Sequence, residues 1–356
     1  MKIYTIVGAR PQFIKAAPVS KALRQAGHEE FLIHTGQHYD YGMSQVFFDE
    51  LQLPQPDVNL GIGSSSHGKQ TGQMLIGIEE ILLGAKPDWV LVYGDTNSTL
   101  AGALAAAKLH IPLAHVEAGL RSFNREMPEE YNRILADQCA ELLFCPTQTA
   151  VKNLRNEGIT KGVHLVGDVM YDAIVQFGEF ARQRSSILKD MALQSKGYVL
   201  ATVHRPSNSD NAENLRNILQ AFSDIDEPVI FPVHPRTRRN IEELGLIGMQ
   251  SSNQKLHLVE PVGYLDMLVL EQNARVIVTD SGGVQKEAYF FAVPCLTLRT
   301  ETEWVETVEA GWNVLTGTDR NRIVDNIRRM SPSKPPAQIF GDGRAAYHIV
   351  NHLPSR

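Results

Sequence analysis

Short apolar runs alternate with amphipathic stretches along the whole chain. The apolar runs lie at residues 3–7, 31–33, 89–92, 112–114, 142–144, 198–202, 228–231, 256–259, 276–278 and 296–298. Each run is short enough for a buried strand, and the stretches that separate them have the periodicity of helices. Strands and helices that alternate in this way are typical of parallel sheets with helices on both faces.

The runs fall into two series, which a charged helical segment at residues 168–196 separates. We therefore expect an α/β protein built from two Rossmann-type domains, each a doubly wound parallel sheet. The first domain is expected at residues 1–169 and the second at residues 170–342. A final amphipathic stretch within residues 343–356 is expected to form a helix that packs back onto the first domain.

One stretch of the second series has the pattern of a ligand site. The apolar run at residues 276–278 leads directly into Thr279-Asp280-Ser281-Gly282-Gly283, and a helical pattern follows. The two glycines leave backbone amides uncovered at a helix N-terminus, which predicts an anion site that suits a phosphate. Glu287 follows one turn later, where a carboxylate could accept ribose hydroxyls. An ordinary turn with an Asp or Ser cap explains the stretch equally well.

Polar side chains also follow other predicted strands, and ligands bind beyond the carboxyl ends of strands in open parallel sheets. The side chains concerned are Arg10, Lys15, Asp95, His115, Glu117, His204 and His234. Each has an ordinary explanation of its own, as a surface cation, a helix cap or a structural histidine. Taken together they predict a cleft that both domains line. It would be a coincidence for so many strand ends to carry such groups, and burying these charges unpaired costs free energy.

A further acidic string precedes the helical run that starts near residue 128. It reads Met127-Pro128-Glu129-Glu130-Tyr131-Asn132-Arg133. Proline at the first helical position and acids in the first turn fit helix capping alone. The functional interpretation adds Glu129 to Asp95 and Glu117 as a third acid. Clustered carboxylates raise one another's pKa, which suits general acid/base chemistry near neutral pH.

Composition limits the classes of partner. The chain has 356 residues, with 34 Lys and Arg against 40 Asp and Glu, a net charge of -6. No basic run stands out, so we expect no nucleic-acid partner. Neither a signal-peptide pattern nor an apolar run of membrane-spanning length is present in the sequence, so we expect a cytoplasmic protein with no membrane partner. Three cysteines at no metal-ligand spacing indicate buried thiols in a reducing compartment.

Six strings occur along the chain in this order: Gly8-Ala9-Arg10-Pro11, Gly94-Asp95-Thr96-Asn97-Ser98-Thr99, His115-Val116-Glu117-Ala118-Gly119-Leu120-Arg121, Pro128-Glu129-Glu130, His234-Pro235-Arg236-Thr237 and Thr279-Asp280-Ser281-Gly282-Gly283. From the first strand to about Gly317, the chain thereby resembles the non-hydrolysing UDP-N-acetylglucosamine 2-epimerases. The resemblance implies a GT-B-like pair of Rossmann domains, a homodimer, and no cofactor or metal. It also implies inversion at C2 of a UDP-sugar, by elimination of UDP to a 2-acetamidoglucal and re-addition, for bacterial-type surface polysaccharide precursors.

The resemblance also assigns roles to individual residues. It implies that Asp95, Glu117 and Glu129 are acid/base carboxylates, and that His204 is an essential histidine of the second domain. Arg10 and Lys15 resemble the basic pair near the sugar and the diphosphate. The residues that resemble the family's UDP-binding set are His234, Ser281, Gly282, Gly283 and Glu287. If the sugar carries a carboxylate, we expect Arg121, Arg125, Arg205 or Arg299 to supply the cation, with Arg299 counted among the substrate-binding residues.

The chain departs from well-known members in three places. It has Thr302-Glu303-Trp304-Val305-Glu306 where they carry Thr-Glu-Arg-Pro-Glu, so an arginine near the substrate is replaced by Trp304. The loop between Arg121 and Pro128 is shorter. The string Gln37-His38-Tyr39-Asp40 matches only in part a string that belongs, in some bacterial members, to a second, activating UDP-sugar site. The first two departures resemble the branch that epimerises UDP-2,3-diacetamido-2,3-dideoxyglucuronate.

Three other functions stay open at this point. A GT-B glycosyltransferase would share the fold and the nucleotide site, but it does not need three acids around the donor's C2. A hydrolysing epimerase, which releases free N-acetylmannosamine, is a closer rival. The sequence separates it from the reversible epimerase only by general likeness. A nucleotide-sugar sensor would need neither the acids nor His204. The sequence therefore favours the reversible epimerase.

Overall fold

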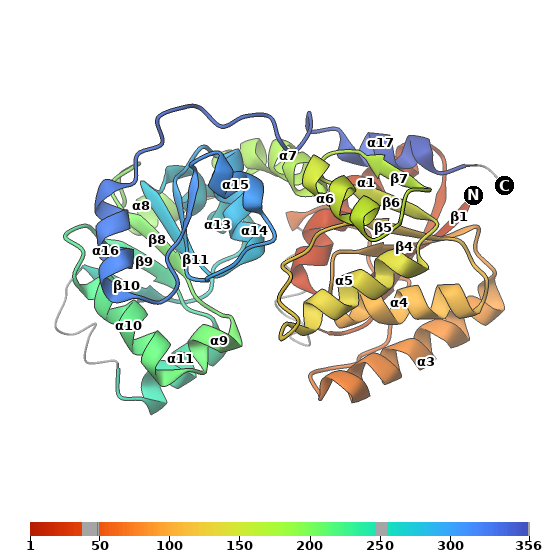
Figure 1. Ribbon diagram of the computed structural model, residues 1–356, viewed down its shortest axis with the longest axis horizontal. Coiled ribbons are helices and arrows are strands. Elements are labelled where there is room, and N and C mark those ends of the chain that lie inside the picture. The colour runs from red at the N-terminus through yellow and green to blue at the C-terminus, as the bar shows by residue number, and fades with distance from the viewer. Residues whose placement is uncertain (38–47, 49, 247–254, 355–356) are drawn as a thin grey trace. The chain divides into compact units, whose positions relative to one another are not determined.

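The computed structural model describes residues 1–37, 48, 50–246 and 255–354 (Figure 1). The chain divides into two compact units, which we call unit 1 (Met1–Gln176 with Gln338–Arg356) and unit 2 (Phe177–Ala337). His38, Tyr39 and Asp40, part of the string linked to an activating site, lie outside the described residues. No helix in the described part of the chain is both long and apolar enough to span a membrane.

Unit 1 contains a seven-stranded parallel sheet in the order β3-β2-β1-β4-β5-β6-β7. Its strands are β1 (Lys2–Val7), β2 (Glu29–His34), β3 (Val58–Asn59), β4 (Trp89–Tyr93), β5 (Leu113–Val116), β6 (Leu142–Cys145) and β7 (Val163–Leu165). Its helices are α1 (Arg10–Gln25), α3 (His67–Ala85), α4 (Asn97–Lys108), α5 (Pro128–Cys139), α6 (Gln148–Asn156) and α17 (Ala345–His352). Helix α7 (Val169–Arg184) starts in unit 1 and continues into unit 2.

Helices α3, α4 and α5 cover one face of this sheet (Figure 1). Met74, Ile78 and Leu82 of α3 are spaced four residues apart, so they form one buried stripe against the sheet. Helix α4 lies very close to the strands. A Cβ atom added at Gly102 would stand only 2.7 Å from Cδ1 of Ile6. Small residues therefore set the distance between this helix and the sheet. Helix α17 packs against α1.

Unit 2 contains a six-stranded parallel sheet in the order β10-β9-β8-β11-β12-β13. Its strands are β8 (Val199–Thr202), β9 (Val229–Pro232), β10 (Leu256–Val259), β11 (Val276–Thr279), β12 (Cys295–Thr297) and β13 (Asn313–Leu315). Its helices are α8 (Ile187–Asp190), α9 (Pro206–Ser209), α10 (Ala212–Ser223), α11 (Pro235–Glu243), α13 (Tyr264–Asn273), α14 (Gly282–Phe290), α15 (Val305–Glu309) and α16 (Arg320–Arg329).

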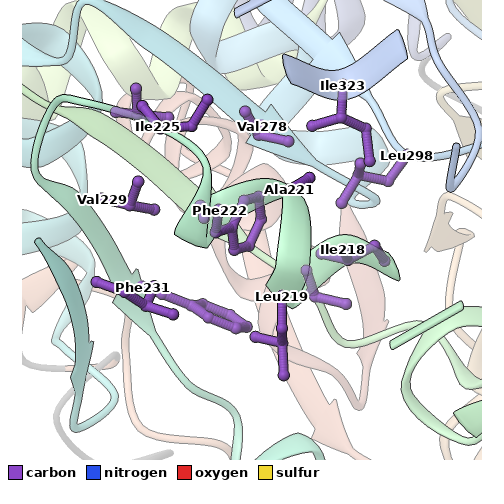
Figure 2. Close-up of a cluster of buried hydrophobic side chains, with 14 of the residues drawn as sticks. Ile218, Leu219, Ala221, Phe222, Ile225, Val229, Phe231, Val278, Leu298 and Ile323 are labelled. Carbon is purple, nitrogen blue, oxygen red and sulfur yellow. The ribbon is translucent and has the colours of Figure 1, made fainter. Parts of the chain in front are cut away.

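The core of unit 2 includes a cluster between α10, α16 and the sheet (Figure 2). Ile218, Leu219 and Phe222 of α10 point into it, and Phe222 meets Phe231 of β9 edge to face, with ring centroids 5.9 Å apart. Burial of each such side chain contributes about 1.5–3 kcal/mol to stability. The amphipathic spacing of α10 therefore fixes the helix on the sheet.

The predicted fold class, two doubly wound parallel sheets, is confirmed, and every predicted strand is present. Three further strands, β3, β7 and β13, were not predicted. Each has only two or three residues, lies at a sheet edge, and is partly exposed, so its sequence lacks a continuous apolar run.

The strand order reverses between β1 and β4 in unit 1 and between β8 and β11 in unit 2. Beyond the carboxyl ends of such a strand pair, the connections leave on opposite sides and open a crevice. In unit 1 this point brings the turn after Val7 beside Gly94. In unit 2 it brings the residues after Thr202 beside Asp280. Both crevices coincide with strings selected from the sequence.

Candidate active site

The turn between β1 and α1 is tied to the end of β4. A Cβ atom at Gly8 would stand 2.0 Å from Oγ1 of Thr35 and 2.2 Å from Oγ of Ser98, so only glycine fits there. Oε1 of Gln12 accepts from the Gly8 amide at 2.8 Å, and Nε2 of Gln12 donates to the Tyr93 carbonyl at 2.9 Å. Gln12 therefore holds the turn against the end of β4, the strand that precedes Asp95.

Arg10 and Lys15 lie in the first half of α1. Arg10 is the first residue of the helix, and burial lowers the pKa of its guanidinium while nearby Glu50 opposes that shift. Lys15 is buried, and its Nζ contacts Oε2 of Glu117. Of the two cations predicted near an anion, Lys15 is therefore paired with an acid of the site.

Glu117 follows β5 with a backbone φ of +71°, in the left-handed region. This region is costly for a residue with a side chain, and such strain concentrates at functional sites. The amides of Glu117 and Ala118 both donate to the Phe144 carbonyl, each at 3.1 Å, which fixes the backbone. The carboxylate is directed at Lys15 and is buried. The residue types around Glu117 give no indication of this conformation.

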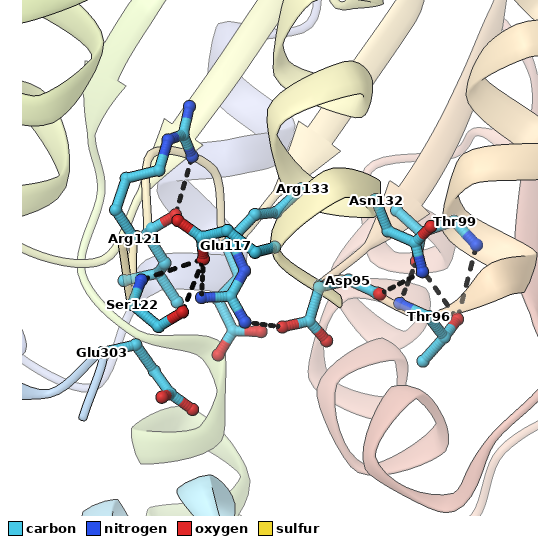
Figure 3. A network of polar contacts seen from close by, with 12 residues as sticks. Asp95, Thr96, Thr99, Glu117, Arg121, Ser122, Asn132, Arg133 and Glu303 are labelled. Carbon is cyan, nitrogen blue, oxygen red and sulfur yellow. Dashed lines mark hydrogen bonds and ion pairs between the residues drawn. The ribbon is translucent and has the colours of Figure 1, made fainter. Parts of the chain in front are cut away.

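Asp95 is held from α5 (Figure 3). Nη2 of the buried Arg133 lies 2.5 Å from Oδ2 of Asp95, and Nδ2 of Asn132 donates to the Asp95 carbonyl at 2.9 Å. The Asp95 side chain remains 32% exposed, so part of the carboxylate faces solvent. Sequence reasoning missed Arg133, although its spacing of four residues from Glu129 places it on the same helical face.

Glu130, the neighbour of Glu129, is the acid of this string that the structure buries. Its Oε2 accepts from the Ser122 amide at 2.9 Å and lies 3.2 Å from Nη1 of Arg133. Glu129 is partly exposed in the first turn of α5. Within the described residues, no hydrogen bond or ion pair joins Glu129 to Asp95 or Glu117. Those two acids are each paired with a cation rather than with one another.

In unit 2, Asp280 organises the crevice. Its fully buried carboxylate accepts from the amides of His204 at 3.1 Å and Arg205 at 3.0 Å, and from Nδ2 of Asn208 at 3.1 Å. Asp280 therefore does not cap α14, which Ser281 does. The sequence alone suggests Asp280 only as a helix cap. Its position directly after β11, the neighbour of β8, is the signal that could have identified its contacts with the residues after β8.

The two histidines predicted in this unit lie near one another. Nδ1 of His204 is 3.4 Å from Oδ1 of Asp280, and the side chain is 45% exposed. His234 begins α11 as its N-cap, with Nδ1 accepting from the Arg236 amide at 3.2 Å. This contact places the ring proton of neutral His234 on Nε2. The ring centroids of the two histidines are 6.5 Å apart.

The N-terminus of α14 packs against the loop that follows β12. Oγ of Ser281 accepts from the Val284 amide at 3.5 Å, as an N-cap does. A Cβ atom at Gly282 would stand 2.5 Å from Oε1 of Glu303 and 3.3 Å from Nε1 of Trp304. Gly283 is partly exposed beside it. The turn therefore presents backbone amides and the positive end of the helix dipole, as an anion site requires.

Glu287 lies further along α14, buried beside Tyr264 and Glu271 of α13. Burial first, and the Glu287 charge second, raise the pKa of Glu271 well above its ordinary value. Two adjacent buried carboxyl groups do not both ionise, so one proton is shared between them. No pattern in the sequence points to Glu271, which stands in an ordinary helical run.

Arg299 and Trp304 follow β12. Nη2 of the buried Arg299 lies 2.9 Å from Oε2 of Glu303 and 3.5 Å from Oε1 of Glu301. Trp304 is only 2% exposed, and Nζ of the buried Lys286 stands over its ring, 4.1 Å from the centroid. Both residues are thus embedded in local interactions of unit 2. The aromatic face of Trp304 packs against Lys286, and this cation–π contact stabilises the pair.

Metal ligation has no candidate in this set. Among the residues that the structure describes, no group of three or more His, Cys, Asp or Glu side chains is arranged to hold a metal ion. The polar groups found are instead amides, carboxylates, histidines and cations, which suit an anionic ligand and proton transfer.

Comparisons with known proteins agree on one family. The family model described as UDP-N-acetylglucosamine 2-epimerase matches residues 21–354. A Methanococcus maripaludis protein named UDP-N-acetylglucosamine 2-epimerase homolog is 57% identical, with 99% of each chain covered. A UDP-2,3-diacetamido-2,3-dideoxy-D-glucuronate 2-epimerase of Pseudomonas aeruginosa is 50% identical, again over 99% of each. The crystal structure of Methanocaldococcus jannaschii UDP-GlcNAc 2-epimerase in complex with UDP-GlcNAc and UDP has a TM-score of 0.94 at 46% identity, covering 99% of each chain.

Proposed function

The chain belongs to the UDP-N-acetylglucosamine 2-epimerase family, and on that premise we propose that it reversibly converts UDP-N-acetylglucosamine to UDP-N-acetylmannosamine. The observation that carries the proposal is the placement of Asp95 and Glu117 after neighbouring strands, each beside a cation. The turn at Gly282 and Gly283 supports nucleotide binding by unit 2. The epimerase class, an isomerase, is that of the family.

The proposed reaction has two halves. A carboxylate removes the C2 proton while the C1–O bond to UDP breaks, which leaves a 2-acetamidoglucal. A protonated acid then returns a proton to the opposite face of C2, and a UDP oxygen re-forms the bond to C1. The C2 proton is only weakly acidic, so departure of UDP must be assisted by stabilising charge on the diphosphate. We assign that task to the α14 amides with His234 and His204, and the proton transfers to Asp95, Glu117 and Glu129.

A second candidate substrate is UDP-2,3-diacetamido-2,3-dideoxyglucuronate. The Pseudomonas aeruginosa relative that carries this name is 50% identical to the chain. Trp304, in place of an arginine, favours the same branch. A sugar with a C6 carboxylate needs a cation, and the acids around Arg299 and Arg121 compensate both of those charges. Nη2 of Arg205 lies 3.8 Å from Oε1 of the same Glu303.

Proton NMR in D2O tests the reaction and separates the alternatives. We expect deuterium at C2 and a manno product when the purified protein is mixed with UDP-N-acetylglucosamine. Free N-acetylmannosamine would instead indicate a hydrolysing epimerase. Failure to exchange C2 with either UDP-sugar, in protein that binds UDP, would overturn the epimerase proposal and leave a glycosyltransferase or a sensor.

We also propose that unit 1 forms the contact of a homodimer. Four large apolar side chains are exposed on α3 and α5, which lie on either side of α4 (Figure 1): Ile76, Leu83, Tyr131 and Leu135. A second copy of the same chain would cover such a surface. Light scattering coupled to size exclusion should give the mass of a dimer for the natural chain. The double variant Ile76→Glu, Leu83→Glu should be monomeric, and an unchanged mass would reject this surface.

We further propose a reducing, cytoplasmic location. The three cysteines are free, and two of them, Cys145 and Cys295, are buried. Burial raises the pKa of Cys295 to about 12, so the thiol stays protonated and unreactive. Such thiols suit a compartment in which disulfides do not form.

A further inference from the structure

His115 lies at the end of β5, fully buried, with an acceptor at each ring nitrogen. Its Nε2 is 2.7 Å from the carbonyl oxygen of Gly94, and its Nδ1 is 2.7 Å from Oδ1 of Asp137 on α5. A carbonyl oxygen only accepts hydrogen bonds, so Nε2 must carry a proton. The question is whether Nδ1 carries one too.

The surroundings of Asp137 answer that question. Oδ2 of Asp137 lies 2.7 Å from Nη1 of Arg121 and 3.1 Å from the Gly119 amide, both of which can only donate. The guanidinium favours the ionised carboxylate. An ionised Asp137 accepts from Nδ1, so the second proton belongs to the ring and His115 is an imidazolium.

Charges around the ring balance without any external ion. Arg121 makes a bidentate pair with Glu157, at 2.7 and 2.6 Å, so two cations face two carboxylates. Among the described residues, Cys145 of β6 also faces this cluster, and the Lys15 and Glu117 pair lies across Gly94 from it. A buried network of this kind is retained only when every member is satisfied.

The network fixes both backbone segments that carry the proposed acids. Gly94 immediately precedes Asp95, and its carbonyl is the group that His115 holds. Glu117 comes two residues after His115, and Asp137 binds the Gly119 amide on its other side. The strained left-handed conformation of Glu117 is thus held from before and after.

We propose that His115, protonated on both ring nitrogens, is a positioning residue that orients Asp95 and Glu117. This proposal rests on the proposed function for the part that concerns turnover. The protonation state itself does not depend on any activity.

The protonation state is tested on the natural protein labelled with ¹⁵N-histidine. Long-range ¹H–¹⁵N correlation spectra distinguish protonated from unprotonated ring nitrogens. We expect one ring to show two protonated nitrogens at pH 7. The His115→Gln spectrum assigns that ring by its loss. A neutral ring for His115 at pH 7 would overturn the proposal, whatever the enzyme does.

Two variants test the effect on catalysis. Glutamine can keep the donor near Nε2, and asparagine can keep the donor near Nδ1, but neither carries the charge. We expect His115→Gln and His115→Asn to lower kcat about 10-fold or more with a smaller change in KM.

His164→Gln is the matched control. His164 lies on β7 and stacks on His352 with ring centroids 4.1 Å apart, and it belongs to neither the Gly94 nor the Asp137 contact. Its kcat and KM should match those of the natural enzyme. Folded His115 variants with the kcat and KM of the natural enzyme would show that His115 only supports the fold. If the natural enzyme fails to exchange C2 at all, the proposed function fails while the protonation result stands.

Discussion

Lys15 and Glu117 meet above Gly94, where a Cβ atom would stand 3.0 Å from Nζ of the lysine and 3.1 Å from Oε2 of the glutamate. The two residues are 102 positions apart in the chain. They meet because β1, β4 and β5 are neighbours and both side chains lie beyond the carboxyl ends of those strands. The lysine charge therefore lies directly beside one of the proposed acid/base carboxylates.

Removal of the proposed acids and of the histidine should abolish most turnover. Loss of a general acid or base typically costs about 10²–10⁴-fold, and we expect this for Asp95→Asn, Glu117→Gln and His204→Ala in the C2 exchange assay. Circular dichroism establishes that each variant is folded. Near-normal rates in all three would show that these residues are not the catalytic groups.

Substitution at the α14 turn should weaken nucleotide binding more than it weakens the fold. In Gly283→Val, a branched side chain would stand where backbone amides approach a phosphate. Calorimetry with UDP should show at least about a 10-fold loss of affinity, equal to about 1.4 kcal/mol. The control is Gly178→Val on α7, where the added Cβ meets nothing within 4 Å. Equal UDP affinity in both variants would reduce the stretch to a simple turn.

Trp304 should influence which sugar is accepted. Arginine is planar, permanently charged and a bidentate donor, whereas tryptophan offers an apolar face and one N–H. In Trp304→Arg, the new cation would also meet Lys286, so we expect a change in the ratio of kcat/KM for the two UDP-sugars. The assay compares UDP-N-acetylglucosamine with UDP-2,3-diacetamido-2,3-dideoxyglucuronate in both proteins. An identical ratio would mean that Trp304 serves packing alone.

Asp172 should make stability depend on pH between about 4 and 6. Its carboxylate accepts from the amides of Ala345 at 3.0 Å and Ala346 at 2.7 Å, and burial raises its pKa from 3.8 to about 6. A raised value means that folding favours the protonated form. The contribution is therefore complete below pH 3.8 and is lost as pH rises through 6, by at most about 3 kcal/mol.

Urea unfolding at several pH values checks this expectation. The difference in the free energy of unfolding between the natural chain and Asp172→Asn should change across this window and stay constant above it. A difference that is independent of pH would mean that Asp172 titrates alike in the folded and unfolded chains.

The sequence was informative where a feature is local. Apolar runs located the strands, and the spacing of Ser281, Gly282 and Gly283 located the start of α14. Features that depend on strand order were out of reach. Asp280 looks like a cap until β8 is known to be its neighbour, and only the packing of α13 on α14 brings Glu271 to Glu287. The left-handed backbone of Glu117 has no signature at all, because it is imposed by contacts on either side.

The return of the chain to unit 1 affects how the protein is made. Helix α17 packs on α1, and Nε1 of Trp89 donates to the Pro354 carbonyl at 3.4 Å, so the last residues complete the first unit. On the ribosome, an N-terminal domain usually folds before the next one is synthesised. Here unit 2 is complete in sequence while unit 1 still lacks α17. A chain that stops before Ala345 therefore leaves its earliest-made part unfinished.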